Sequence, residues 1–320
     1  MKRRIKKKAV FVLLFIIVLI IGAILGIKKT IETNKYHKTY EYKFLKLEYT
    51  KEEFDIIDTL SVEDKDYLLT LNYNRRIPKL IKEKYFMKKN LKKYINYFNK
   101  ESDLSKIVSI INVGANVDFY TDAKKTDISK KELMLTNKFN YLDDTYDSKE
   151  MVSVSKLYSY GENQMLTSTT FDAFKRMFDD AKKENITLII NSSYRSFEDQ
   201  EAVYERYKKL KGEDYADSIA ARPGYSEHQT GYSVDLITYG ATSATFEETE
   251  AFKWLQNNAY KYGFILRYPK DKDYLTGYSY ESWHYRYVGI DAAKYIYENN
   301  ITFDEYYAYF IEGDSNVKEK

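Results

Sequence analysis

An uncharged, strongly apolar run from Ala9 to Ile27 constrains this chain more than any other feature of its sequence. At the rise of an α-helix the run extends over roughly 28 Å, which is enough to cross the hydrocarbon core of a membrane. It consists almost entirely of Val, Leu, Ile and Phe and leaves no polar face, which disfavours a buried core helix. We therefore expect a membrane-spanning helix at the N-terminus.

The basic residues before this run predict its orientation. Residues 2–8 are almost all Lys or Arg, and such a cluster favours a cytoplasmic N-terminus with the rest of the chain outside. A cleaved signal peptide is the alternative, but its apolar region would usually be shorter and end in a small-x-small site. Gly22 and Ala23 are the only small pair, and further apolar residues follow them. We expect an uncleaved, single-pass anchor in the cell membrane.

The composition excludes several classes of function. The 320 residues include no cysteine, which rules out disulfides, thiolate metal sites, a cysteine nucleophile and a lipid-modified cysteine anchor. The balance of 51 basic against 48 acidic residues leaves a net charge of +3, and much of that excess lies at the N-terminus. Because no basic patch is visible elsewhere, we expect no nucleic-acid partner.

Changes in pattern along the chain predict its organisation. After a charged, Tyr-rich stalk, Thr50 with Glu53 and Ser61 with Asp64 resemble N-terminal capping pairs of short helices. This region is interpreted as a helical spacer, or alternatively as a docking module for a partner that nothing in the sequence identifies. The predicted parts are a basic tail and anchor (1–29), a stalk and helical spacer (30–112), a catalytic domain (113–312) and a flexible tail (313–320).

The third part alternates helices and strands irregularly. Apolar residues at helical spacing predict a helix over 169–184, and Ser196 with Asp199 predicts the start of another. β-branched or alternating patterns predict strands at 186–190 and 232–237. The long loops between some of these elements favour an α+β domain over a doubly wound parallel sheet.

The chain has only three histidines. His37 lies in the stalk and is interpreted as a solvated surface residue. His228 falls in a predicted turn, and Asp235 lies on the strand that follows, with Gly231 between them to let the chain bend back. The two side chains could converge on one ion, although this spacing alone is also typical of a core histidine and a loop aspartate.

The remaining histidine, His284, follows Glu281 by three residues. Zinc in hydrolases commonly takes three protein ligands and leaves one position for water, and a further carboxylate off the metal can accept that water's proton. Glu281 is the candidate for this base. Since positions three apart face opposite sides of a regular strand, the segment must bulge or turn for both side chains to point inward.

A third segment places Arg195 directly after the predicted strand at 186–190. A guanidinium at a strand end near a metal suits a carboxylate or a developing oxyanion, which it binds with a forked pair of hydrogen bonds. The alternative is a helix-capping loop with a surface arginine.

Together these segments resemble the VanY-type D-alanyl-D-alanine carboxypeptidases, a group that includes related LD-carboxypeptidases of cell-wall metabolism. The resemblance covers roughly residues 130–300. The family pattern runs S-x-Y-R-S with a Gln soon after, then S-x-H-x-x-G-x-x-x-D, G-F-x-x-R-Y-P and E-x-W-H-x-R. In this chain it appears at Ser192–Ser196 with Gln200, Ser226–Asp235, Gly263–Pro269 and Glu281–Arg286.

The resemblance implies a small, mainly antiparallel sheet with helices packed on it. It also implies roles for particular residues. His228, Asp235 and His284 would bind Zn²⁺, Glu281 would act as general base and then acid, and Arg195 would steady the carbonyl oxygen or the substrate carboxylate. Residues implied to line the substrate pocket are Ser193, Tyr194, Gln200 and Trp283.

The implied activity is hydrolysis of the terminal D-alanine from peptidoglycan stem peptides at the cell surface. The motifs are shared with LD-carboxypeptidases that act on tetrapeptide stems and with endopeptidases that cut inside the stem or cross-link, so these stay open as alternatives. A non-catalytic, membrane-tethered wall-binding module would be favoured if Glu281 or one of the ligands were missing, and all are present.

Overall fold

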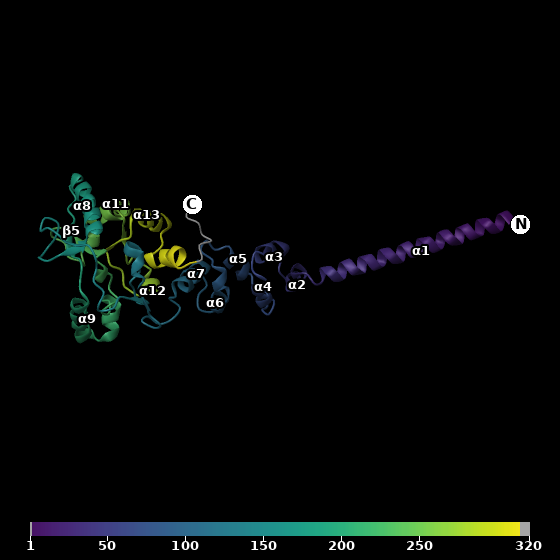
Figure 1. Cartoon of the computed structure of the whole chain (residues 1–320), viewed down its shortest axis with the longest axis horizontal. Coiled ribbons are helices and arrows are strands. Elements are labelled where there is room, and N and C mark those ends of the chain that lie inside the picture. The colour runs from purple at the N-terminus through teal and green to yellow at the C-terminus, as the bar shows by residue number, and fades with distance from the viewer. Residues whose placement is uncertain (1, 314–320) are drawn as a thin grey trace. The chain divides into compact units, whose positions relative to one another are not determined.

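A computed structural model of the chain describes residues 2–313 (Figure 1). The chain separates into two compact units, which divide between Ser105 and Lys106. Helix α7 (Leu104–Val113) packs mostly within the second unit, although the sequence-based division assigned residues up to 112 to the spacer. The predicted flexible tail at 313–320 lies almost entirely outside the described residues.

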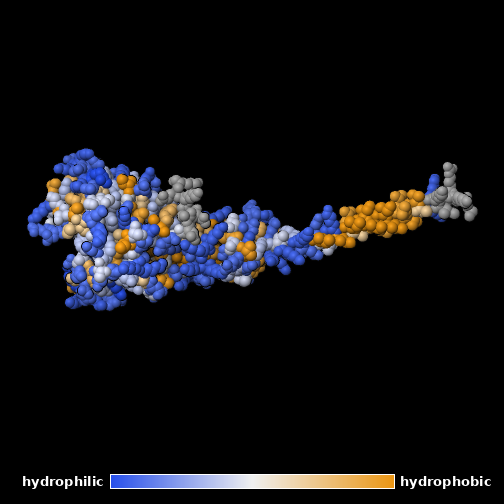
Figure 2. Space-filling view, viewed as in Figure 1, coloured by the Kyte–Doolittle hydropathy of each residue, from blue (hydrophilic) through white to orange (hydrophobic). Residues whose placement is uncertain are grey.

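The first unit begins with α1 (Lys2–Tyr36), the helix that contains the apolar run. Its segment Lys7–Tyr36 is long and apolar enough to cross a membrane, and none of its most apolar window is buried against the rest of the chain. Figure 2 shows this hydrophobic surface continuing along α1. A signal sequence near the N-terminus can meet the same criterion of length and composition, so these two properties establish a membrane-compatible helix.

Short helices with a small core of their own follow α1 in the first unit. Phe44, Ile57, Leu68 and Tyr94 are fully buried there. Both predicted caps are confirmed, because Thr50 forms a capping box with Glu53 and the Ser61 hydroxyl accepts from the Asp64 N–H. The elements are α2 (Tyr40–Lys46), α3 (Lys51–Ile57), α4 (Val62–Leu68), α5 (Arg76–Ile81), η1 (Lys88–Asn90) and α6 (Leu91–Asn96).

The second unit is built on a four-stranded sheet in the order β5-β6-β8-β7, with every neighbouring pair antiparallel. Its strands are β5 (Ile189–Ser192), β6 (Ser233–Ile237), β7 (Phe264–Leu266) and β8 (His284–Tyr287). Two minor pairs lie outside it, β1 (Lys124–Lys125) with β2 (Asn140–Tyr141) and β3 (Met151–Ser153) with β4 (Met165–Thr167). The predicted α+β class with a small, mainly antiparallel sheet is confirmed.

Helices and short 3₁₀ or π turns connect these strands or follow the last of them. In chain order they are η2 (Ile128–Leu133), α8 (Ser168–Lys183), α9 (Phe197–Lys211), α10 (Glu213–Ile219), η3 (Glu227–Thr230), η4 (Phe246–Glu248), α11 (Glu250–Asn258), η5 (Ala259–Tyr262), α12 (Asp273–Thr276), α13 (Ile290–Asn299), α14 (Phe303–Tyr306) and η6 (Tyr307–Ile311).

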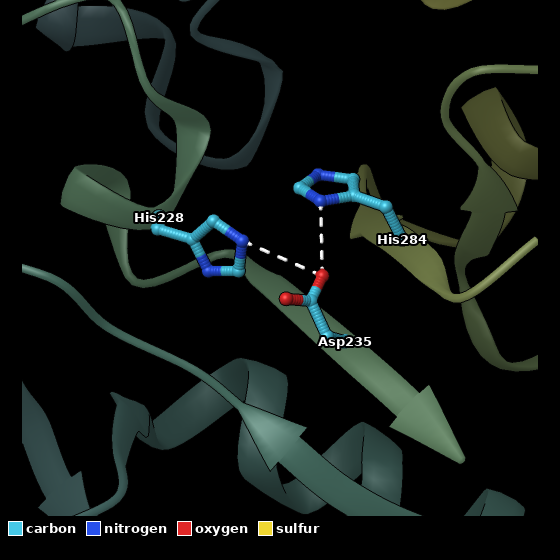
Figure 3. A group of neighbouring side chains, drawn as sticks. All are labelled: His228, Asp235 and His284. Carbon is cyan, nitrogen blue, oxygen red and sulfur yellow. Dashed lines mark ion pairs between the residues drawn. The ribbon is translucent and has the colours of Figure 1, made fainter. Parts of the chain in front are cut away.

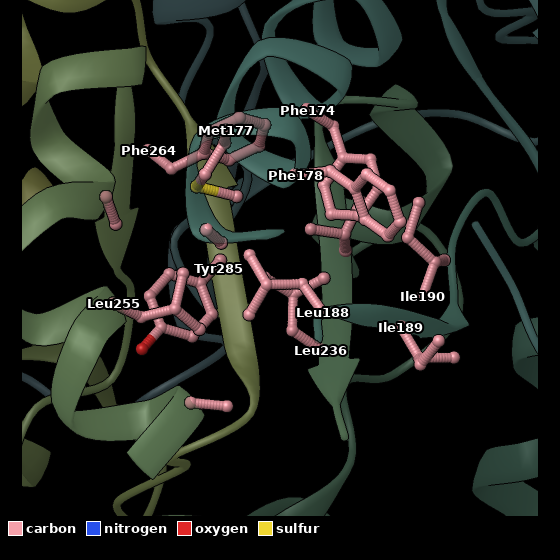
Figure 4. Close-up of a cluster of buried hydrophobic side chains, with 14 of the residues drawn as sticks. Phe174, Met177, Phe178, Leu188, Ile189, Ile190, Leu236, Leu255, Phe264 and Tyr285 are labelled. Atoms are coloured by element: carbon pink, nitrogen blue, oxygen red, sulfur yellow. The ribbon is translucent and has the colours of Figure 1, made fainter. Parts of the chain in front are cut away.

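One face of the sheet packs against α8 and α11 to form the main core (Figure 4). Phe174, Met177 and Phe178 of α8 are buried at helical spacing and lie over strand residues such as Leu236. Full burial of one such side chain is worth about 1.5–3 kcal/mol, so this packing, more than local helix propensity, stabilises α8.

The sequence-based boundaries of α8 agree with the structure to within one residue at each end, and Ser196 caps α9 as predicted. The strand predicted at 186–190 is displaced, because β5 covers Ile189–Ser192. Asn185 adopts φ +61° at the end of α8, and the Ile186 N–H still bonds back to the Ala181 carbonyl. The first part of the β-branched run therefore completes the helix terminus before the strand begins.

Candidate active site

The register of β6 with β8 places Asp235 directly opposite His284. Side chains alternate between the two faces of a strand. The neighbours Val234 and Tyr285 point into the hydrophobic core, so Asp235 and His284 project from the other face. Residues that are about 50 positions apart in sequence thus become cross-strand neighbours.

His228 reaches the same face from η3, which precedes β6. Gly231 ends η3 at φ +72°, in the left-handed region, and reverses the chain into the strand. A Cβ at this position would lie 2.8 Å from the Met151 sulfur, so both conformation and space favour glycine. The predicted bend between His228 and Asp235 is present.

The structure brings His228, Asp235 and His284 together, as Figure 3 shows. One ligand atom from each lies within 4.8 Å of the others; Asp235 Oδ1 is 3.5 Å from His228 Nε2 and 3.2 Å from His284 Nδ1. Ligand atoms around a tetrahedral ion at Zn–N distances lie about 3.3 Å apart. Asp235 Oδ1 is buried and forms no hydrogen bond among the described residues. The donor set and its spacing therefore fit a divalent cation.

The hydrogen bonding of His228 assigns its tautomer. Its Nδ1 lies 2.6 Å from the Ser193 carbonyl oxygen, which can only accept a hydrogen bond. The Nδ1 atom must therefore carry the proton, and the lone pair of Nε2 faces Asp235 and is available to a metal.

The charges at the site favour a cation. Burial acts to raise the pKa of Asp235, but His228 and His284 outweigh it and hold that pKa below its ordinary value. Burial acts to lower the pKa of His284, yet the neighbouring carboxylates of Asp235 and Glu227 raise it to about 9. A metal ion binding here would replace the proton on His284, because ligating imidazoles must be unprotonated.

Glu281 lies just before β8, separated from it by a bend at residues 282–283. Its N–H donates to the Tyr268 carbonyl, and its Oε2 is 3.7 Å from His284 Nδ1. The turn that sequence spacing required is therefore present. Burial raises the pKa of Glu281 to about 7, which suits a group that takes up and returns a proton near neutral pH.

Arg195 is held at the end of β5 by two side chains. One terminal nitrogen donates to Gln200 Oε1 at 2.7 Å and the other to Ser192 Oγ at 3.1 Å. The Gln200 amide nitrogen in turn donates to the Ala221 carbonyl at 2.7 Å. Gln200 therefore orients the Arg195 guanidinium in addition to lining the site.

A cleft of about 510 Å³ contains the metal-ligating group. Of the residues that the sequence assigned to the pocket, Gln200 and Trp283 line it together with Arg195 and Glu281, whereas Ser193 and Tyr194 do not. The Ser193 hydroxyl is buried and bonds to Gln164 Oε1 at 2.6 Å. Its contribution to the site is the backbone carbonyl that holds His228.

Sequence reasoning gave no role to Glu227, a buried carboxylate next to the metal-ligating group. Its Oε2 lies 3.6 Å from His284 Nε2, and its Oε1 accepts from Arg267 Nε at 2.8 Å. Burial acts to raise the pKa of Glu227, but Arg267 and Arg286 hold it well below its ordinary value. The sequence did offer one signal for Glu227, which is its position inside the Ser226–Asp235 motif. The arginines that pair with Glu227 could not be predicted from the sequence.

Comparisons with known proteins agree with this geometry. Residues 163–290 match the family model of VanY, D-alanyl-D-alanine carboxypeptidase. The chain is 42% identical over 204 residues to YodJ of Bacillus subtilis (strain 168), covering 59% of this chain and 74% of that protein. It is 35% identical over 195 residues to a D-alanyl-D-alanine carboxypeptidase of Enterococcus faecalis (strain ATCC 700802 / V583), covering 58% of this chain and 69% of that protein.

A solved structure supports the same relationship. The LdcB LD-carboxypeptidase aligns with a TM-score of 0.56 and 38% identity, covering 61% of this chain and 94% of that one. The residues that match the family model include His228, Asp235, Glu281 and His284. The chain belongs to the VanY family of D-alanyl-D-alanine carboxypeptidases.

Proposed function

We propose that this protein is a zinc-dependent carboxypeptidase that removes the terminal D-alanine from peptidoglycan stem peptides. The convergence of His228, Asp235 and His284 beside the mostly buried carboxylate of Glu281 carries the proposal. Two imidazoles and one carboxylate form a ligand set typical of catalytic zinc in hydrolases. Family membership supports the choice of a D-alanyl-D-alanine bond.

The residues divide the chemistry between them. A bound Zn²⁺ would polarise the scissile carbonyl and lower the pKa of a water molecule towards about 7. Glu281 accepts the proton of the attacking water and later donates it to the nitrogen of the departing D-alanine. Its raised pKa suits both steps, because a base whose pKa lies near the working pH can also return the proton.

Arg195 binds either the developing oxyanion or the free carboxylate of the substrate. We expect Arg195→Ala to lower kcat/KM by about 10²-fold or more, since the loss of one such donor in a water-poor site costs roughly 10²–10³ in rate. Arg195→Lys should recover only part of this, because an ammonium cannot supply the forked pair of hydrogen bonds. Steady-state kinetics with zinc content as the control would measure the effect; unchanged kcat/KM in both variants would argue against the role.

The likeness to an LD-carboxypeptidase structure favours one alternative, namely removal of D-alanine from tetrapeptide stems. The protein is incubated with defined pentapeptide and tetrapeptide muropeptides, and the masses of the products are measured. This experiment distinguishes DD-carboxypeptidase from LD-carboxypeptidase activity. We expect the pentapeptide to lose one alanine and the tetrapeptide to persist. Trimming of the tetrapeptide alone would instead assign LD-specificity, and an internal cut would assign an endopeptidase.

The N-terminal helix supports a single-pass location in the cell membrane with the catalytic unit outside. Its apolar segment has no buried contacts, so its removal should leave the catalytic unit intact. We expect the full chain to sediment with membranes and a variant lacking residues 1–36 to remain in solution with unchanged kcat/KM. The mass of the membrane-bound protein decides between anchor and signal sequence, since a cleaved N-terminus would contradict the anchor. Residues 30–112 would then serve as a spacer.

A further inference from the structure

A chain of buried charged side chains extends from the metal-ligating group to the end of the second unit. The Glu227 side chain has no exposed surface, and neither have those of Arg267 and Asp304. Burial of even one unpaired charge is costly, so each must be compensated by a neighbour. Unlike the surface ion pairs of this protein, this chain of charges begins beside His284, one of the proposed zinc ligands.

The orientation of His284 requires a specific tautomer. Its Nδ1 faces Asp235 Oδ1 at 3.2 Å, on the side of the other two ligands. For Nδ1 to offer a lone pair, the proton must sit on Nε2, and the nearest carboxylate oxygen to Nε2 is Glu227 Oε2 at 3.6 Å. An ionised carboxylate can only accept, so it favours that tautomer and also makes the ring a better ligand.

We propose that Glu227 is a positioning residue of the metal site, which holds His284 with its Nε2 protonated and its Nδ1 directed at the ion. The proposal rests on the zinc-binding part of the proposed function. His228 shows the complementary arrangement, with Nδ1 bound to the Ser193 carbonyl and Nε2 free. His284 Nε2 is buried and forms no hydrogen bond among the described residues, and the carboxylate that faces it at 3.6 Å is Glu227.

The buried arginines keep Glu227 in place. Arg267 Nε donates to Glu227 Oε1 at 2.8 Å, and Arg286 approaches the same oxygen at 3.3 Å. Arg267 also forms a forked pair with Asp304, at 2.6 and 3.1 Å. The two guanidinium groups face the two carboxylates, so these four side chains together carry no net charge.

Asp304 belongs to α14, close to the end of the described chain. Its Oδ1 also accepts from the Asn137 amide at 2.7 Å, which fixes the carboxylate independently of Arg267. Helix α14 therefore acts on the metal site through Arg267 and Glu227, although it lies outside the part that matches the family model. We expect the loss of Asp304 to weaken zinc binding without any direct contact to the ligands.

Zinc affinity of the full-length protein tests the proposal, measured by competition with a chromophoric chelator. Glu227→Gln keeps the shape of the side chain and should lower the affinity by about 10- to 100-fold, the usual loss when such an outer carboxylate is removed. Asp304→Asn should lower it in the same direction by a smaller factor. The matched control is Glu305→Gln, a buried carboxylate of the same helix that bonds Ser109 and the Thr302 N–H instead of Arg267.

The control should lose thermal stability without losing zinc affinity, which separates a positioning role from a general weakening of α14. In the Co²⁺-substituted protein, Glu227→Gln should also shift the visible absorption bands, a change that a purely structural role would not produce. If Glu227→Gln does not fold, Asp304→Asn carries the test. If both Glu227→Gln and Asp304→Asn bound zinc with wild-type affinity, the proposal would be overturned. A wild-type protein that binds no zinc would instead overturn the proposed function itself.

Discussion

Replacing Glu281 with alanine is expected to leave zinc in place and remove nearly all turnover. Glu281 lies beside the ligand group without belonging to it, with its Oε2 3.7 Å from His284 Nδ1. The ligands in the variant are intact, so the ion should still bind. General acid–base catalysis contributes about 10²–10⁴ in rate, and one residue here performs both proton transfers, so kcat should fall by at least that factor.

The measurement is kcat on a D-Ala-D-Ala-terminated peptide together with metal content by elemental analysis. Glu298→Ala serves as the control, because Glu298 is an exposed residue of α13 that pairs only loosely, at 3.8 Å, with Lys294 of the same helix. It should match the wild type in both measurements. Full activity in Glu281→Ala would refute the assignment of the base, and loss of zinc would move Glu281 into the ligand set.

Removal of the metal is expected to have the other large effect. Dialysis against a chelator should reduce activity to background, and added Zn²⁺ should restore it, because no other described group in the cleft can activate water in the same way. His284→Ala should lose activity that zinc does not restore at ordinary concentrations, since it removes one of three ligands.

To check this, activity and bound zinc are measured in the same samples, first after the ion is removed and again after it is added back. Chelator-treated protein should also unfold at a lower temperature, because the two buried histidines and the mostly buried Asp235 lose the ion that compensates them. Turnover that persists after zinc is gone would contradict a metal-dependent mechanism.

The sequence by itself determined the features that depend on neighbouring residues. The apolar run predicted α1, and Ser196 and Thr50 predicted helix starts, because a cap acts on N–H groups only two or three positions away. The motifs also indicated that His228, Asp235 and His284 belong to one site, since each lies in a segment whose order and spacing are distinctive.

The tertiary structure decided which distant residues support that site. Glu227 meets Arg267 and Asp304 only after the chain has folded, at separations of 40 residues between the first two and 37 between the last two. No periodicity encodes such contacts, because they arise from the register of β6 against β8 and from the packing of α14. The same holds for Ser193, whose carbonyl and not its side chain orients His228: which group of a residue faces a site depends on the fold around it.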